Sequence, residues 1–357
     1  AAGDRMLNVL VIDDDAAERS AMVRALQGDP GVRISGAFSS GEEAAREISR
    51  SAPDVVVMDT MMPGIDGFEA TRMIMSSVPV PIILVSARLD SHTARLSSSA
   101  LEAGAVAFLE KPGDEKAAGH LKKKMKLLQA VKAMAEVKVI RRWDRQRQTE
   151  KAKSCSSPEF TLMRSRPEIV AIGASVGGPP VVRSIISKLP ENFPVPILVV
   201  QHILQGFSGG MVDWMNEDRR GPRICMARGG DRAAAGSVYF APDGVQMKIM
   251  PDRTIVLTND EPEDGFRPSV SYMFRSVARS FGDRSVGILL TGMGRDGAGG
   301  LKDMREAGAF TIVQDEESCV VFGMPGEAVK MGAVSRVMRP DKIPEILVKA
   351  AGMPSTT

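Results

Sequence analysis

The sequence predicts two α/β domains, each a doubly wound parallel sheet, joined by a linker. Short apolar strands alternate with amphipathic helical stretches in two separate regions of the 357-residue chain, which is long enough for two ordinary domains. The strands are apolar almost throughout, as is typical of parallel strands that are covered on both faces. We place the domains at residues 1–130 and 167–350, and a basic, first helical and then flexible linker at 131–166.

The first domain is expected to contain five strands with helices between them. The strands are the apolar runs Leu7–Ile12, Val32–Ala37, Val55–Met58, Pro81–Val85 and Ala107–Leu109. The helices are the amphipathic stretches at 16–27, 41–50, 67–76 and 93–103. Parallel sheets carry their sites at the carboxyl ends of the strands, so those ends are where functional residues are sought.

The stretch at 114–150 is basic and predicted to be helical. Apolar residues recur in it at helical spacing, which predicts a stripe that faces the core. The stripe consists of Leu121, Met125, Leu128, Val131 and Met134. Residues 141–157 are polar and poor in apolar side chains, which indicates an exposed linker.

Charge is unevenly distributed along the chain. The net charge of +2 divides into −6 over residues 1–112, +8 over 113–157 and 0 over 158–357. We interpret the basic stretch as a solvated linker helix, because it has no zinc-finger spacing and Trp143 is its only aromatic residue. No nucleic acid partner is therefore expected.

Composition also sets the expected compartment. The longest apolar runs are too short to cross a bilayer, so no direct membrane insertion is expected. The three cysteines, Cys155, Cys225 and Cys319, are widely spaced and indicate neither a disulfide framework nor a metal site. We expect a cytoplasmic protein.

The second domain alternates strands and helices again. Strands are expected at 168–172, 196–200, 237–240, 247–250, 254–257, 285–290 and 309–313. Helices are expected at 179–188, 207–217, 269–280, 297–307 and 325–330. The segment 237–258, with turns at 242–244 and 251–253, is predicted to be a local antiparallel excursion.

Polar residues follow four of the five strands of the first domain. Asp13 to Asp15 follow the first strand and Asp59 the third, while Ser86 ends the fourth and Lys111 follows the fifth. Carboxylates that converge at one sheet edge repel one another unless a hard cation such as Mg²⁺ is bound. Helix capping would explain one or two of these carboxylates, but not a hydroxyl and a lysine at two further strand ends.

This pattern resembles the receiver domain of bacterial response regulators over residues 6–130. The resemblance implies a flavodoxin-like fold in which Asp59 is the phospho-acceptor and Asp13 and Asp14, together with Asp59, hold Mg²⁺. A phosphoryl group adds about −2 of charge, enough to bias a two-state element. The first domain is therefore expected to be a switch.

The resemblance also assigns the residues that respond to the phosphoryl group. Ser86 and Lys111 stand at the phosphoryl-sensing positions, and Phe108 stands at the position of the switch aromatic. Asp15 stands where many receivers have a small or neutral residue, a difference that bears on how long the phosphoryl group persists.

The segment Ile169–Gly178 predicts a buried strand, a tight turn that carries Ser175, and a helix. Residues 173–177 spell G-x-S-x-G, the pattern that exposes a nucleophilic serine at a sharp strand-to-helix corner. The glycines permit unusual dihedral angles and close backbone approach. An alternative, a dinucleotide-binding oxidoreductase, requires G-x-G-x-x-G and an acidic residue about 20 residues further on, and both are missing.

A nucleophilic serine needs a base, and the chain contains three histidines. His92 and His120 belong to the first domain and the basic helix, whereas His202 follows a strand of the second domain. Asp296 lies in a glycine-rich turn after the strand at 285–290 and is the candidate carboxylate that orients the imidazole. The order Ser, His, Asp differs from that of α/β-hydrolases, so that fold is not expected.

These motifs resemble those of the chemotaxis-specific protein-glutamate methylesterases. The resemblance rests on residues 173–178, 201–202, 267–270, 290–297 and 319–325 and covers nearly the whole chain. It implies hydrolysis of glutamyl methyl esters on chemoreceptors, and deamidation of certain receptor glutamines, without a cofactor for the ester chemistry. It further implies a chemotaxis histidine kinase as phosphodonor, and a receiver that covers the catalytic site until it is phosphorylated.

The family resemblance assigns roles within the second domain. Ser175 is implied as nucleophile, His202 as base and Asp296 as orienting acid, with the backbone amides of Val176 and Met293 as oxyanion donors. The sequence departs from the family at Val176, where threonine is common, at residues 203–205 and at Ser271, where aspartate is common. A second domain that only binds a ligand is the remaining alternative, and its net charge of 0 argues against nucleic acid as that ligand.

Overall fold

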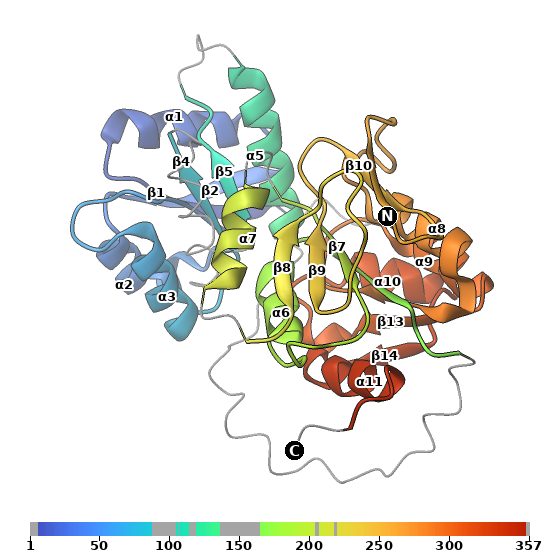
Figure 1. Ribbon diagram of the computed structural model, residues 1–357. Coiled ribbons are helices and arrows are strands. Elements are labelled where there is room, and N and C mark those ends of the chain that lie inside the picture. The colour runs from blue at the N-terminus through green and yellow to red at the C-terminus, as the bar shows by residue number, and fades with distance from the viewer. Residues whose placement is uncertain are drawn as a thin grey trace. The chain divides into compact units, whose positions relative to one another are not determined.

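The chain forms two compact units, Ala1–Ser154 and Cys155–Thr357, in a computed structural model. The structure describes residues 6–87, 105, 107–113, 119–135, 165–203, 207–217 and 220–354. The predicted helix at 93–103, His92 and most of the predicted linker at 131–166 lie outside these residues. Both units are α/β (Figure 1). Among the described residues, no helix is long and apolar enough to cross a membrane.

The first unit contains the predicted parallel sheet of five strands in the order β2-β1-β3-β4-β5. The central strand β3 is buried throughout, and its neighbours β1 and β4 are buried at four residues each, because helices cover both faces of the sheet. The strands are β1 (Leu7–Ile12), β2 (Val32–Phe38), β3 (Val55–Asp59), β4 (Ile82–Ser86) and β5 (Ala107–Glu110). The predicted runs therefore differ from the observed strands by one residue at most at each end.

Three of the described helices of the first unit begin at a side chain that caps them, whereas the fourth begins after Gly119. Asp15, Ser40 and Asp66 each accept a hydrogen bond from a backbone amide in the first turn of the helix that follows. The helices of this unit are α1 (Ala16–Gln27), α2 (Gly41–Ser51), α3 (Gly67–Ser77) and α5 (His120–Met134). The capping explanation considered for the acidic cluster is thus correct for Asp15 alone among Asp13 to Asp15.

The predicted core-facing stripe of the basic helix is wrong in its first half. Leu121 and Met125 are 73% and 60% exposed, respectively, and Leu128 is only half-buried. Val131 and Met134 are buried as predicted, whereas Leu127 is buried in place of Leu128 and His120 in place of Leu121, because two interleaved sets of positions satisfy helical spacing in this helix. The buried side chains of α5 are His120, Leu127, Val131 and Met134.

The second unit is built on a seven-stranded sheet in the order β14-β13-β12-β6-β7-β9-β8, and every pair in it is parallel. Its strands are β6 (Ile169–Ala174), β7 (Ile197–Gln201), β8 (Arg223–Met226), β9 (Ser237–Phe240), β12 (Ser285–Leu289), β13 (Phe310–Gln314) and β14 (Arg336–Met338). A separate antiparallel hairpin is formed by β10 (Gln246–Ile249) and β11 (Ile255–Thr258). The predicted antiparallel segment 237–258 is therefore antiparallel only over β10 and β11, because β9 pairs with β7 in the main sheet.

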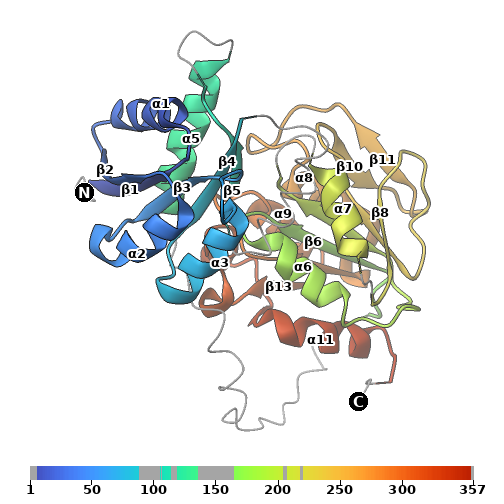
Figure 2. The ribbon, with the colours of Figure 1, turned by 90° about the vertical axis from the view of Figure 1, so that its left-hand side faces the viewer.

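Helices cover both faces of this sheet (Figures 1 and 2). One face packs against α8 (Val270–Phe281), α9 (Ala298–Glu306), α10 (Met324–Lys330) and the hairpin. The other packs against α6 (Gly178–Ile186), α7 (Ser208–Asn216) and α11 (Ile343–Ala350). Alternate residues of β6 divide between the two cores, with Ala171 in one and Ile172 in the other. The prediction of a doubly wound α/β fold is confirmed.

Three elements of the second unit were not predicted. The edge strands β8 and β14 have four and three residues and each includes an arginine, so they lack an apolar run. Helix α11 has eight residues and a proline in its first turn. Elements this short contain too few residues to show a periodic pattern, and their structure depends on packing against the rest of the unit.

Candidate functional site

The predicted catalytic residues of the second unit lie at one edge of its sheet, around the central strand β6. Ser175 follows β6, His202 follows β7 and Asp296 lies in the turn after β12, and both β7 and β12 pair with β6. Backbone pairing continues past the strand ends, with His202 N donating to Ala174 O (2.9 Å) and Ser175 N to Thr291 O (3.0 Å). The sheet continues from β6 to β7 on one side and to β12 on the other, so the site lies where the strand order reverses, as is typical of doubly wound sheets.

The turn that carries Ser175 depends on its glycines. Gly177, at the start of α6, has φ = +74°, so the left-handed residue of the turn is this glycine rather than the serine. A Cβ on Gly173 would lie 2.1 Å from Val270 Cγ1, and a Cβ on Gly178 would lie 2.3 Å from the amide oxygen of Gln201. The expected close approach of the backbone is therefore present on both sides of Ser175.

His202 and Asp296 form a hydrogen-bonded pair. His202 Nε2 lies 2.8 Å from Asp296 Oδ2. Within the described part of the chain, His202 Nδ1 has no hydrogen-bond partner, so the Ser175 hydroxyl is not bonded to it here. A ring that donates from Nε2 to a carboxylate keeps a lone pair on Nδ1 when it is neutral. Nδ1 is thus the nitrogen that is able to accept a proton, and catalytic hydrogen bonds of this kind are often unformed without substrate.

The carboxylate of Asp296 is fully buried and accepts four hydrogen bonds. Oδ1 accepts from Ser269 Oγ (2.8 Å) and Ser271 N (2.9 Å), while Oδ2 accepts from Val270 N (2.8 Å) and His202. Burial by itself raises the pKa of the Asp296 carboxyl, but the bonds from His202 and the backbone amides outweigh it, and the pKa lies below its usual 3.8. The carboxylate is therefore ionised at neutral pH.

Phe266 covers one face of the His202 imidazole. The two rings are parallel to within 4°, and their centroids are 3.9 Å apart. The loop that carries Phe266 is held by Gln246, whose Nε2 donates to Phe266 O (3.2 Å) and Glu261 O (3.1 Å). Phe266 remains 37% exposed, so it also offers an apolar surface beside the base.

The two predicted oxyanion donors belong to the turns after β6 and β12. Among the described residues, the backbone amides of Val176 and Met293 donate no hydrogen bond. Thr291 links the two turns, because its Oγ1 donates to Val176 O (3.0 Å) and accepts from Val321 N (2.9 Å). Two free amides are thus held on turns adjacent to Ser175.

In the first unit, Lys111 lies within a group of carboxylates. Its Nζ lies 2.8 Å from Asp13 Oδ2 and 2.9 Å from Asp59 Oδ2, and it also pairs with Glu18. Burial raises the pKa of Asp13 to about 6 and also raises that of Asp59, although Lys111 opposes both shifts. Lys111 faces the carboxylates of Asp13, Glu18 and Asp59, so one positive charge meets three negative groups.

The donor set of this cluster fits a magnesium ion. Carboxylate oxygens of Asp13, Asp14 and Asp59 lie within 4.8 Å of one another, and all are the hard ligands that Mg²⁺ prefers. The uncompensated charge at buried Asp13 and Asp59 is what a divalent cation would neutralise.

The remaining predicted residues of the first unit lie at the same sheet edge. Ser86 ends β4, and its carbonyl accepts a hydrogen bond from Lys111 N (2.8 Å). Phe108 is buried in β5, paired with Leu84 of β4. Asp15 is turned away from the cluster, because its side chain accepts from the first amides of α1.

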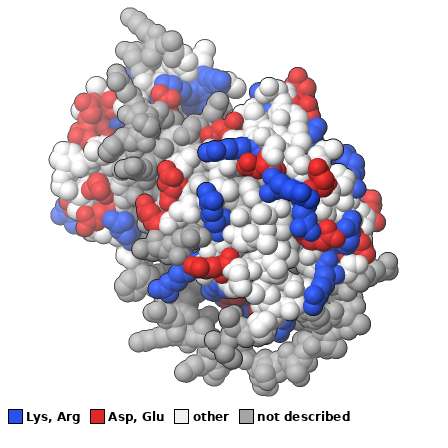
Figure 3. All heavy atoms as spheres, in the orientation of Figure 1, with Lys and Arg blue, Asp and Glu red and all other residues white. Residues whose placement is uncertain are grey.

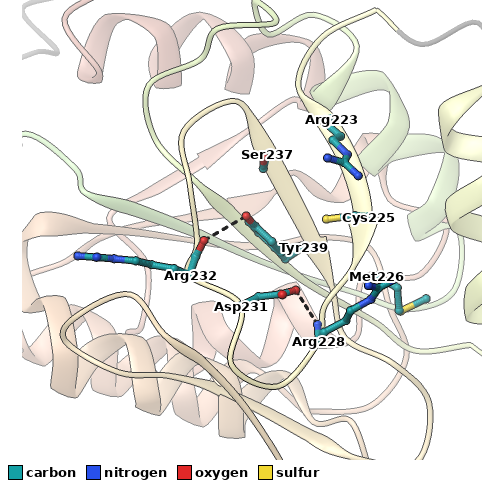
Figure 4. A pocket seen from close by; sticks show the side chains of 8 residues that line it. All are labelled: Arg223, Cys225, Met226, Arg228, Asp231, Arg232, Ser237 and Tyr239. Atoms are coloured by element: carbon teal, nitrogen blue, oxygen red, sulfur yellow. Dashed lines mark hydrogen bonds between the residues drawn. The ribbon is translucent and has the colours of Figure 1, made fainter.

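A surface pocket at the end of the sheet formed by β8 and β9 does not belong to this site. It has a volume of about 320 Å³ and lies on β8, β9 and the loop between them. Figure 4 shows Arg223 and Arg232 extending in different directions rather than converging on one point. Figure 3 likewise shows acidic side chains mixed with the basic ones on this face. No predicted catalytic residue lines the pocket.

Comparison with known proteins identifies both units. Residues 170–347 match the CheB methylesterase family, and residues 9–123 match the response regulator receiver domain. Over 348 residues the chain is 48% identical to a protein-glutamate methylesterase/protein-glutamine glutaminase of Syntrophus aciditrophicus, covering 97% of this chain and 99% of that protein. The chain belongs to the family of protein-glutamate methylesterases/protein-glutamine glutaminases.

Two further matches of this methylesterase/glutaminase are a second relative and a solved structure. A protein of the same name from Geobacter metallireducens is 46% identical over 347 residues, covering 97% of this chain and 99% of the relative. The crystal structure of the CheB methylesterase catalytic domain of Thermotoga maritima is 33% identical with a TM-score of 0.49, and covers 51% of this chain and 98% of that chain.

Sequence reasoning did not find the residues that surround the His202–Asp296 pair. Ser269 and Ser271 precede Asp296 by 27 and 25 residues and come from the start of α8, which no strand-end argument reaches. Phe266 was also missed, although it directly precedes the Arg-Pro-Ser-Val segment that carries the family resemblance. Of the other two histidines, His120 is buried in the first unit against the carbonyls of Pro112 and Gly113.

Proposed function

We propose that this protein hydrolyses glutamyl methyl esters of chemoreceptors through Ser175, His202 and Asp296, and that phosphorylation of Asp59 activates it. The observation that carries the catalytic part is the hydrogen bond between His202 Nε2 and buried Asp296, which leaves Nδ1 as the free nitrogen at the edge that bears Ser175. The names of the relatives support the choice of substrate.

The first step is acylation of Ser175. His202 Nδ1 takes the proton of the Ser175 hydroxyl while the serine oxygen attacks the ester carbonyl carbon. Asp296 stabilises the imidazolium that forms, because its ionised carboxylate accepts the Nε2 proton in a hydrogen bond. The imidazolium then protonates the departing methoxide oxygen, and methanol leaves.

The oxyanion of the tetrahedral intermediate requires donors that are already in place. The free amides of Val176 and Met293 take this role, since both lie on turns that hydrogen bonds hold at the same sheet edge. Each such donor contributes about 10²–10³-fold to kcat in enzymes of this kind.

The second step is hydrolysis of the acyl-enzyme. His202 takes a proton from water, whose oxygen attacks the acyl carbon. The imidazolium then returns that proton to the departing Ser175 oxygen, which regenerates the serine hydroxyl and releases a receptor glutamate. The same sequence with ammonia as leaving group converts a receptor glutamine to glutamate, which is the glutaminase activity in the names of the relatives. No step of either reaction uses a metal.

Replacement of Phe266 by alanine is expected to lower kcat about 2- to 10-fold, because an aromatic pair contributes about 0.5–1.5 kcal/mol to fixing the imidazole. Phe266→Tyr should retain the stacking and nearly full activity. Steady-state methanol release measures both variants, with exposed Met331→Ala as the control for loss of an apolar side chain. A normal kcat for Phe266→Ala would contradict a role for this stacking.

Regulation is assigned to the first unit. The Asp59 carboxylate attacks the phosphorus of a phosphohistidine on a chemotaxis histidine kinase, and the phosphorus–nitrogen bond breaks as the kinase histidine leaves. Asp13, Asp14 and Asp59 would hold Mg²⁺. Mg²⁺ held by these carboxylates would offset the negative charge of the phosphoryl oxygens. Lys111, which already contacts Asp59 Oδ2 at 2.9 Å, then pairs with the phosphoryl group, and Ser86 hydrogen bonds to it.

Asp59→Asn is expected to abolish activation by a small-molecule phosphodonor with Mg²⁺ while leaving basal methanol release unchanged, because the amide cannot accept a phosphoryl group. Glu47→Gln, which removes a carboxylate from α2 instead, should be activated normally. Undiminished activation of Asp59→Asn would show that another residue is phosphorylated or that activation does not involve the receiver.

A further inference from the structure

Gln201 is the last residue of β7, and its side chain bridges the two residues that react. Its Nε2 donates to the backbone carbonyls of Ser175 (2.8 Å) and His202 (2.9 Å). The carboxamide is nearly fully buried, and its Oε1 has no hydrogen-bond partner among the described residues. A single amide group therefore links the backbone of the candidate nucleophile to that of the candidate base.

Gly178 provides the room that this amide occupies. A Cβ at residue 178 would lie 2.3 Å from Gln201 Oε1 and 2.7 Å from Ala174 Cβ, so the amide of Gln201 is the nearest group and Ala174 the second. Gly177 has a left-handed conformation, but Gly178 does not and begins an ordinary helix, so its dihedral angles do not demand glycine. The second glycine of the pair is thus required by close approach.

We propose that Gln201 is a positioning residue that sets the separation of Ser175 from His202, and that Gly178 serves to admit its amide group. This inference rests on the proposed function. Reactive groups need to meet at about 3–3.5 Å, and a misplacement of about 1 Å costs on the order of 10²-fold in rate. A buried amide with two short hydrogen bonds fixes the two backbones without touching the substrate.

The test is a double-mutant cycle on the full-length protein, with methanol release as the assay. Gln201→Ala is expected to lower kcat about 10- to 100-fold with KM unchanged, because the reacting atoms are misaligned while the substrate surface is intact. Gly178→Ala should lower kcat in the wild-type background. In the Gln201→Ala background, Gly178→Ala should cost less, because the nearest group that it displaces is absent and only the contact with Ala174 Cβ remains.

Asn216 supplies a matched control in the same unit. Its Nδ2 also bridges two backbone carbonyls, those of Val212 (2.9 Å) and Ile224 (3.0 Å), but it joins α7 to β8. Asn216→Ala should lower the melting temperature and leave kcat unchanged. If Asn216→Ala lost as much kcat as Gln201→Ala, the loss in Gln201→Ala would reflect general destabilisation of the unit. That result would overturn the proposal.

Two further outcomes would overturn the inference and leave the proposed function standing. One is a Gln201→Ala protein with wild-type kcat and only a lower melting temperature. The other is an additive cycle, in which Gly178→Ala costs the same factor with and without Gln201. A wild-type protein without methanol release is a different result, because it contradicts the proposed function itself.

Discussion

Ser175→Ala is expected to lower kcat for methanol release by about 10⁴–10⁶-fold, because residues that act as a unit in catalysis lose most of the rate when any one is removed. His202→Ala should fall in the same range. The double variant should be no slower than the slower single variant, since neither residue works without the other. Receptor preparations that carry radiolabelled methyl groups make such low rates measurable.

The control for this prediction is Ser184→Ala, which changes an exposed serine in α6, the helix that follows Ser175. Its activity should be unchanged. Substantial activity in Ser175→Ala would contradict the assignment of the nucleophile, and rate losses of Ser175→Ala and His202→Ala that multiply in the double variant would contradict their action as a pair.

Asp296→Asn is the second large expected effect, a fall in kcat of about 10⁴-fold. Asp296 accepts hydrogen bonds at both oxygens, so asparagine places its NH₂ group against two of the donors. With the NH₂ facing His202 Nε2, that nitrogen becomes an acceptor and the ring proton moves to Nδ1. The base then has no lone pair toward Ser175.

A matched control for Asp296→Asn is Asp303→Asn, which alters a surface carboxylate paired with Arg275 in the same unit. Asp303→Asn should retain wild-type kcat. Near-ultraviolet circular dichroism separates loss of chemistry from loss of folding in Asp296→Asn, because Phe274 and Phe281 of α8 are buried in the core of the second unit and report on its packing. Wild-type activity in folded Asp296→Asn would show that the carboxylate does not orient the base.

The sequence predicted the positions of Ser175, His202 and Asp296 because each follows a different strand of a parallel sheet. Strands of this kind are buried on both faces and stand out as apolar runs, and their carboxyl ends meet at one edge. The same reasoning located Asp59 and Lys111 in the first unit. What strand ends contribute to a site can therefore be predicted without coordinates.

The supporting contacts could not be predicted, since they come from distant segments that packing brings in. Ser269 and Phe266 reach the His202–Asp296 pair from the loop before α8, and nothing in their spacing indicates it. Helix phase was a second limit, because Leu121 and Leu127 of α5 both fit a helical stripe and only packing decides that Leu127 is buried. Edge strands as short as β8 have no periodicity to detect.

The most direct test of the account is methanol release from membranes that contain methylated chemoreceptors, measured for the wild type, Ser175→Ala and Asp59→Asn, with and without a small-molecule phosphodonor and Mg²⁺. The account predicts release by the wild type that rises with the phosphodonor, basal release without that rise in Asp59→Asn, and background release in Ser175→Ala. Equal release by the wild type and Ser175→Ala would contradict it.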